Sequence, residues 1–173
     1  MGVRSRISRR PPFAPLKFTE LLNPDCTSCA LEAASKKRAL ELAGELLART
    51  YPEFDAEAVF DALMARERLG STAVGEGVAI PHCRLESCDR PVGALMQLAS
   101  GVDFDAPDGE PVDLLFILVV PAEAHEDHLQ LLASAAGAFN EPRYRDALRR
   151  AQDARDLFDA AHYDPPERGA AAG

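Results

Sequence analysis

The sequence predicts an α/β protein in which helices cover both faces of a central β-sheet. The run VDLLFILVVP at 112–121 is apolar without alternation, which is typical of a strand buried on both faces. Before and after it lie stretches with apolar residues at helical spacing, at 31–50 and from Glu126 onward. A chain of 173 residues is long enough for one domain with a sizeable core.

Two helices are predicted before the first strand. The first spans 31–50, where leucine and alanine recur at helical spacing, and Pro52 ends it. The second spans 56–69, with Asp55 as its N-cap and Gly70 directly after its last residue. No strand pattern precedes either helix.

Three strand-like runs follow, at 78–81, 92–99 and 112–121. The third is expected at the centre of the sheet because it is apolar throughout. The first ends in Pro81, which cannot donate a hydrogen bond to a sheet and which favours extended backbone before it. We therefore expect His82 just beyond a strand end, where it projects into solvent.

Three helices are predicted after the last strand. The first begins at Glu126, where acidic residues suit the positive end of a helix dipole. The sequence Asn140-Glu141-Pro142 ends it and starts a short helix that reaches Gln152. Asp153 is expected to cap a final helix.

Charge divides the chain unevenly. The net charge is −9 at pH 7, yet residues 1–17 contain five basic side chains, three prolines and no acidic side chain. We expect 1–17 to form a disordered tail, with contact to an anionic partner as the alternative, 18–163 to form the domain, and 164–173 to fray. The acidic body disfavours nucleic acid and favours partners with basic docking faces.

No apolar run approaches the roughly 20 residues that a membrane-spanning helix needs. The N-terminal segment also lacks the apolar stretch of about 7 to 15 residues found in secretory signals. We therefore expect a cytoplasmic protein without membrane insertion.

The cysteines occur as two close pairs, Cys26 with Cys29 and Cys83 with Cys88. The gap between the pairs is far longer than the roughly 15 to 20 residues that join two zinc knuckles. No strand pattern precedes Cys26, as a redox CxxC motif would require. A zinc site and a redox pair are therefore weaker alternatives to ordinary reduced thiols.

A metal site that combines His82, Cys83, His125 and His128 is a further alternative. It is disfavoured because two helical ligands normally lie four residues apart, whereas these two histidines lie three apart in an opening turn. We expect neither a metal nor a cofactor.

Three residues suit the transfer of a phosphoryl group to nitrogen, which requires a nucleophile together with cations or donors for the phosphate oxygens. His82 offers a largely neutral imidazole, because its reference pKa is about 6.5. Arg66 ends the second helix, from which the chain passes Ser71 and Thr72 on its way to His82. His128 lies in the first turn of a helix, where free amides favour an anion. Taken separately, each residue also has an ordinary structural explanation.

These residues lie in two longer segments, RERLGSTAVGEGVAIPH and VDFDAPDGEPVDLLFILVVPAEAHEDHLQLLA. From about Phe18 to Ala161 the chain resembles the type-2 enzyme IIA domain of the bacterial phosphoenolpyruvate phosphotransferase system. The resemblance implies an α/β sandwich with a central mixed β-sheet flanked by helices on both sides. It also implies a phosphotransferase in which His82 accepts a phosphoryl group from a phosphohistidine on a small HPr-like carrier. Arg66 would then balance the phosphate charge, and His128 would hydrogen-bond the phosphoryl group or orient His82.

Within this family the chain is more similar to the nitrogen-regulatory branch than to the fructose or mannitol branches, since it carries no fused permease or IIB domain. The resemblance implies a regulator whose phosphorylation state changes which target protein it binds, with that target unidentified. Two alternatives stay open. One is a sugar-specific component that passes phosphate to a IIB domain, and the other is a binding module that no longer turns over phosphate.

Two further expectations concern the surroundings of the histidine. Val74, Val78 and Phe104 are expected to form an apolar docking patch for the carrier. Cys83 replaces the small residue that the family often has after the histidine, which raises the question of whether thiol oxidation disturbs the site.

Overall fold

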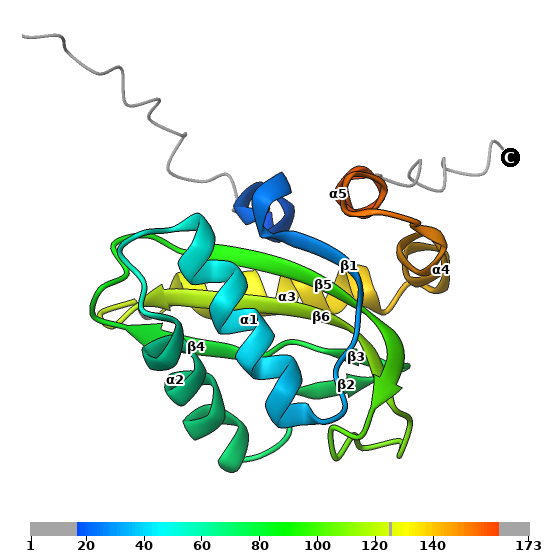
Figure 1. Cartoon of the computed structure of the whole chain (residues 1–173), viewed down its shortest axis with the longest axis horizontal. Coiled ribbons are helices and arrows are strands. Elements are labelled where there is room, and N and C mark those ends of the chain that lie inside the picture. The colour runs from blue at the N-terminus through cyan, green and yellow to red at the C-terminus, as the bar shows by residue number, and fades with distance from the viewer. Residues whose placement is uncertain (1–16, 125, 163–173) are drawn as a thin grey trace, which may run out of the picture.

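The structure, a computed structural model, describes residues 17–124 and 126–162. The predicted basic tail apart from Lys17, the predicted frayed end at 164–173 and His125 lie outside these residues. The described part is an α/β fold with a mixed six-stranded sheet between helices, as predicted (Figure 1). None of its helices is long and apolar enough to cross a membrane.

The elements follow one another in a regular order. The strands are β1 (Thr27–Leu31), β2 (Ala73–Gly75), β3 (Val78–Ala79), β4 (His82–Leu85), β5 (Val92–Val102) and β6 (Val112–Pro121). The α-helices are α1 (Lys36–Thr50), α2 (Ala56–Arg68), α3 (Glu126–Phe139), α4 (Pro142–Arg150) and α5 (Ala154–Ala161). Two short 3₁₀ helices, η1 (Phe18–Leu21) and η2 (Pro24–Cys26), precede β1.

β6 lies at the centre of the sheet, as its unbroken apolar sequence predicts. The strand order is β1-β5-β6-β3-β2, and β4 also pairs with β6. β5 runs antiparallel to β6 on one side, whereas β3 and β4 run parallel to it on the other. Every side chain from Leu114 to Val120 is fully buried.

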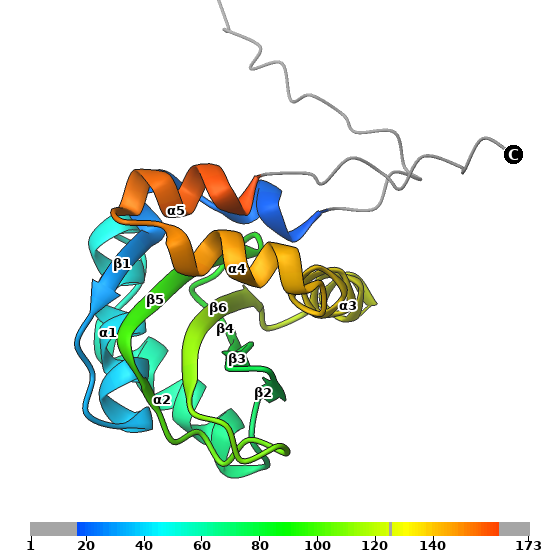
Figure 2. The same cartoon turned by 90° about the vertical axis from the view of Figure 1, so that its right-hand side faces the viewer.

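The two faces of the sheet carry different helices (Figure 2). Leu115, Ile117 and Val119 of β6 belong to an apolar cluster with side chains of α1 and α2. Leu114 and Phe116 belong to a second cluster with side chains of α3, α4 and α5. Because successive side chains of a strand point to opposite faces, this one strand anchors both helical layers.

The N-terminal prediction is wrong in one respect, because a strand precedes the helices. Residues 27–31 form β1, which pairs in parallel with β5, and α1 begins only at Lys36. The Ser35 hydroxyl caps α1 by accepting a hydrogen bond from the amide of Arg38 at 3.1 Å. β1 is short and depends on pairing with a strand more than 60 residues later, so no local pattern predicts it.

The predicted N-caps of α2 and α5 are confirmed, whereas α4 ends at Arg150, two residues before the predicted Gln152. The Asp55 carboxylate caps α2 by accepting from the amide of Ala58 at 2.9 Å. The Asp153 carboxylate caps α5 in the same way, with the amide of Asp156 at 2.8 Å. β5 is longer than predicted and continues to Val102.

The predicted single strand at 78–81 is also wrong. β3 ends at Ala79, and the chain then pairs again with the same neighbour, so that β3 lies opposite Leu114 and Leu115 while β4 begins opposite Leu118. Pro81 has no amide hydrogen to donate, so the hydrogen bonding of the chain to β6 is interrupted between β3 and β4. His82 therefore opens a strand and is partly buried, rather than following a strand end into solvent.

Two helical glycines provide a test of this packing. At Gly44 of α1, an added Cβ would lie 2.6 Å from the backbone oxygen of Ala56 at the start of α2, whereas at Gly137 of α3 it would meet no described atom within 4 Å. We expect Gly44→Ala to lower the free energy of unfolding by about 1–3 kcal/mol through overpacking. We expect Gly137→Ala to raise it by up to about 1 kcal/mol through helix propensity. Urea denaturation measures both changes, and a Gly44→Ala variant at least as stable as the wild type would contradict the packing of α1 on α2.

Candidate functional site

The His82 ring has a defined tautomer. Its Nδ1 lies 2.9 Å from the carbonyl oxygen of Ile80, two residues earlier in the bend between β3 and β4. A carbonyl oxygen only accepts, so Nδ1 carries the proton and donates it to this bond. Nε2 therefore keeps its lone pair, which makes it the nucleophilic atom of the ring.

Arg66 lies against that nucleophilic nitrogen. From the last turn of α2, its Nε donates to His82 Nε2 at 3.2 Å, and its Nη1 donates to the carbonyl of Gly70 at 2.9 Å. Since a guanidinium only donates, this contact independently requires a lone pair on Nε2. The structure thus places a fixed positive charge where a phosphoryl group bound to Nε2 would lie.

A buried carboxylate holds the end of α2 in this position. The Glu67 carboxylate accepts from the Thr72 amide at 3.1 Å, from the Thr72 hydroxyl at 2.6 Å and from Lys36 Nζ at 3.1 Å. The Ser71 hydroxyl donates to the carbonyl of Phe104. The hydroxyls of Ser71 and Thr72, which the sequence suggested as donors for phosphate, therefore fix the loop instead.

His128 brings a second imidazole to the site from the first turn of α3. Its ring centroid lies 5.2 Å from that of His82, with the ring planes at 56°. Only 9% of the residue is exposed, and neither ring nitrogen has a hydrogen-bond partner among the described residues. A buried polar group without a partner costs about 1–3 kcal/mol, so this ring requires an explanation. A ligand between the two imidazoles would supply one.

Both histidines favour the neutral form. Burial is the largest cause that lowers the pKa of His82 below its usual 6.5, and the charge of Arg66 lowers it further, although the Ile80 carbonyl and Glu67 act in the opposite direction. Burial also lowers the pKa of His128, together with the charges of His82 and Arg84. At neutral pH, His82 thus has a free lone pair without needing a base to remove a proton.

Arg84 is a neighbour that sequence reasoning missed. It lies in β4 two residues after His82, with its side chain exposed. Residues two apart on a strand face the same side, so Arg84 shares its face with His82. This alternation would have identified Arg84 if the sequence had revealed β4.

Of the three residues expected in the docking patch, only Val74 lies at the surface, where it is 50% exposed. Val78 and Phe104 are fully buried, so the prediction that they lie on the surface is wrong. Val78 packs with side chains of the α3 layer, and Phe104 lies in the opposite core with Lys36 Nζ over its ring. The exposed large apolar residues near the site in sequence are instead Leu69 and Leu129.

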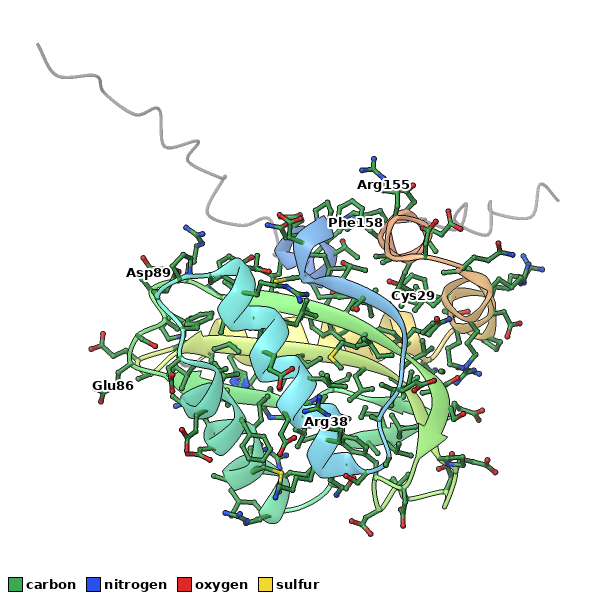
Figure 3. All side chains as sticks on the ribbon, viewed as in Figure 1. Cys29, Arg38, Glu86, Asp89, Arg155 and Phe158 are labelled. Carbon is green, nitrogen blue, oxygen red and sulfur yellow. The ribbon has the colours of Figure 1, made fainter. Side chains whose placement is uncertain are left out.

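The cysteines lie apart from this chemistry. All four are free thiols, and no group of three or more metal-ligating side chains occurs among the described residues. Cys83 points into the α1 and α2 core, away from His82, and burial raises the pKa of its thiol to about 12. Cys29 faces the α4 and α5 side, where its Sγ lies 2.7 Å from Gln97 Oε1 (Figure 3). Because so little of the Cys83 thiol is ionised, Cys83 is a poor target for oxidation.

Comparisons with known proteins agree on one family. The model of the family described as "Phosphoenolpyruvate-dependent sugar phosphotransferase system, EIIA 2" matches residues 20–161. A nitrogen regulatory protein of Pseudomonas aeruginosa is 48% identical over 143 residues, which cover 83% of this chain and 93% of the relative. A fructose-specific EIIA component of Haloferax volcanii is 36% identical over 147 residues, which cover 85% and 90%.

A solved structure supports the same grouping. The nitrogen regulatory protein IIA-Ntr of Neisseria meningitidis superposes with a TM-score of 0.75 at 41% identity. The match covers 83% of this chain and 97% of that one. The fold and the sequence therefore point to the same group of proteins.

The contact between Arg66 and His82 predicts how the nucleophile titrates. In Arg66→Gln a positive charge and a donor to the lone pair are lost, so the protonated form becomes less unfavourable and the pKa of His82 rises toward 6.5. NMR titration of the His82 ring measures this change. Arg68→Gln, which removes an exposed charge from the same helix turn, should leave the His82 pKa unchanged. A His82 pKa that falls or stays constant in Arg66→Gln would contradict the assigned contact.

Proposed function

This chain belongs to the EIIA 2 family of the phosphoenolpyruvate-dependent phosphotransferase system, and on that premise we propose that it is a phosphocarrier and regulator. Nε2 of His82 accepts a phosphoryl group from the phosphohistidine of an HPr-like carrier protein. The observation that carries this proposal is the hydrogen bond from Nδ1 to the Ile80 carbonyl, which leaves the opposite nitrogen as a lone pair beside Arg66.

The transfer step needs no external acid or base. The Nε2 lone pair of His82 attacks phosphorus, and the bond between phosphorus and the carrier's ring nitrogen breaks with its electron pair returning to that nitrogen. A carrier ring protonated at its other nitrogen leaves as neutral imidazole. The His82 ring takes up the corresponding positive charge, which the Ile80 carbonyl stabilises through the Nδ1 proton.

Arg66 and His128 complete the site for the phosphoryl group. The Arg66 bond to Nε2 cannot persist once phosphorus occupies that lone pair, so its N–H groups become donors to the phosphate oxygens instead. His128, neutral and without a partner among the described residues, offers one ring N–H as a second donor. Groups fixed in advance in this way stabilise developing charge without reorganisation.

Phosphorylation also changes what the surface presents to partners. A phosphoryl group adds nearly two negative charges at pH 7. Exposed apolar side chains that suit a protein interface, Leu69 and Leu129, follow Arg66 and His128 closely in the sequence. One face therefore serves both to receive phosphate and to bind a target protein in only one of the two states.

The regulatory branch is favoured over sugar uptake. Identity is higher with the nitrogen regulatory relative than with the fructose-specific one. The fructose-specific relative nevertheless supports a second candidate, a component that passes phosphate to a IIB domain during uptake. Incubation of the phosphorylated protein with separate IIB proteins distinguishes the two, because rapid loss of phosphate to one of them would favour transport.

The labelling reaction tests the proposal directly. With labelled phosphoenolpyruvate, enzyme I and an HPr-like carrier, we expect acid-labile, base-stable label on the wild type and none on His82→Ala. Arg66→Gln should fold normally and label about 100-fold more slowly, as expected when a preorganised donor is lost.

His162→Gln is the matched control, because it removes another accessible ring, whose nitrogens lie 2.8 Å and 3.1 Å from the carbonyl oxygens of Phe158 and Thr19. This variant should label as the wild type does. Label on His82→Ala, or none on the wild type, would refute the phosphocarrier proposal, and the latter result would favour a binding module without phosphate turnover.

A further inference from the structure

Arg84 occupies the same face of β4 as the nucleophile. The burial pattern of this strand alternates, with Cys83 in the core while His82 and Arg84 reach the outer side. At about 3.3 Å per residue, their Cα atoms are separated by roughly 6.6 Å, which an arginine side chain spans. The charge of Arg84 also acts on the buried ring of His128. Because Cys83 faces the α1 and α2 core, His82 and Arg84 face the side of the sheet that carries the α3 layer, whereas Arg66 approaches from α2.

No described residue neutralises Arg84. It makes neither a hydrogen bond nor an ion pair with any side chain that the structure describes, in contrast to Arg66, which donates to His82 and Gly70. Glu86, the next acidic residue along the chain, projects outward at the end of the molecule (Figure 3). Among the residues that the structure describes, Arg84 and the ring nitrogens of His128 thus have no partner.

The acceptor oxygens of a phosphoryl group give this arrangement a purpose. A phosphoryl group on Nε2 carries nearly two negative charges and three strong acceptor oxygens. Arg66 donates to Nε2 from the α2 side. A second guanidinium on the open side of the group would offer another planar fork of donors to these oxygens.

We propose that Arg84 is the second phosphate-binding guanidinium of the site, which holds the phosphoryl oxygens on the His128 side opposite Arg66. This inference rests on the proposed function, since it assumes that His82 carries phosphate. A contact with a carboxylate of the carrier is the alternative use of the same side chain. The unpartnered His128 nitrogens favour the phosphoryl group, because one anion then satisfies both residues.

The equilibrium of phosphoryl exchange separates these two uses. A contact with the carrier alters the forward and reverse rates together and leaves the equilibrium constant between the free proteins unchanged. A contact with the phosphoryl group stabilises the phosphorylated chain itself and therefore shifts that constant. We expect Arg84→Gln to lower the equilibrium constant for transfer from the carrier by about tenfold, which corresponds to the loss of one charge-assisted interaction.

Two further variants control this measurement. Arg68→Gln removes an exposed arginine from the end of α2 and changes the net charge equally, and it should leave the equilibrium within about twofold of the wild type. Arg84→Lys keeps the charge but loses the planar fork, so its constant should fall by about threefold. If Arg84→Gln does not fold, the equilibrium constant of Arg84→Lys provides the test in its place.

The outcomes distinguish the two proposals. In one outcome the wild type takes up phosphate, and the equilibrium constants of Arg84→Gln and Arg84→Lys both equal that of Arg68→Gln. This outcome would overturn the role of Arg84 and leave the phosphocarrier function intact. Slower exchange in Arg84→Gln at an unchanged equilibrium would assign Arg84 to carrier docking and would equally overturn the proposal. Wild type that takes up no phosphate would instead refute the proposed function.

Discussion

The hydrogen bond between His82 Nδ1 and the Ile80 carbonyl is the interaction on which the site depends. Without it, either ring nitrogen of a neutral imidazole can hold the proton. With it, the lone pair is fixed at Nε2, and Arg66 and His128 lie around the atom that we propose as the phosphoryl acceptor. In the proposed transfer the ring becomes positively charged, and the Ile80 carbonyl would remain available to accept from its Nδ1 proton.

The backbone makes this bond possible through a break in the sheet. β3 and β4 are two short strands that pair with successive parts of β6, and Pro81 separates them. The break leaves the Ile80 carbonyl free of the ladder and turned toward the ring of His82. Because β4 pairs with β6 alone, α2 from one face and α3 from the other both reach the nucleophile at this edge.

Much of this arrangement could be predicted from the sequence. The apolar run of β6 identified the sheet centre, and Asp55 and Asp153 identified helix starts. The Pro81-His82 step drew attention to the histidine that we propose as the nucleophile. β1 and β4 could not be predicted, because strands of four or five residues depend on distant partners rather than on their own pattern. Missing β4 also hid Arg84. The burial of Phe104 was missed because a single aromatic in a loop gives no periodic signal.

NMR of the phosphorylated protein, with ¹⁵N-labelled histidine, tests the central claim most directly. The account predicts a one-bond coupling between phosphorus and Nε2 of His82, with a proton retained on Nδ1 toward Ile80. Phosphorus bonded to Nδ1, or to another histidine, would contradict it, because the hydrogen bond that fixes the lone pair would then have to be absent in the reacting molecule.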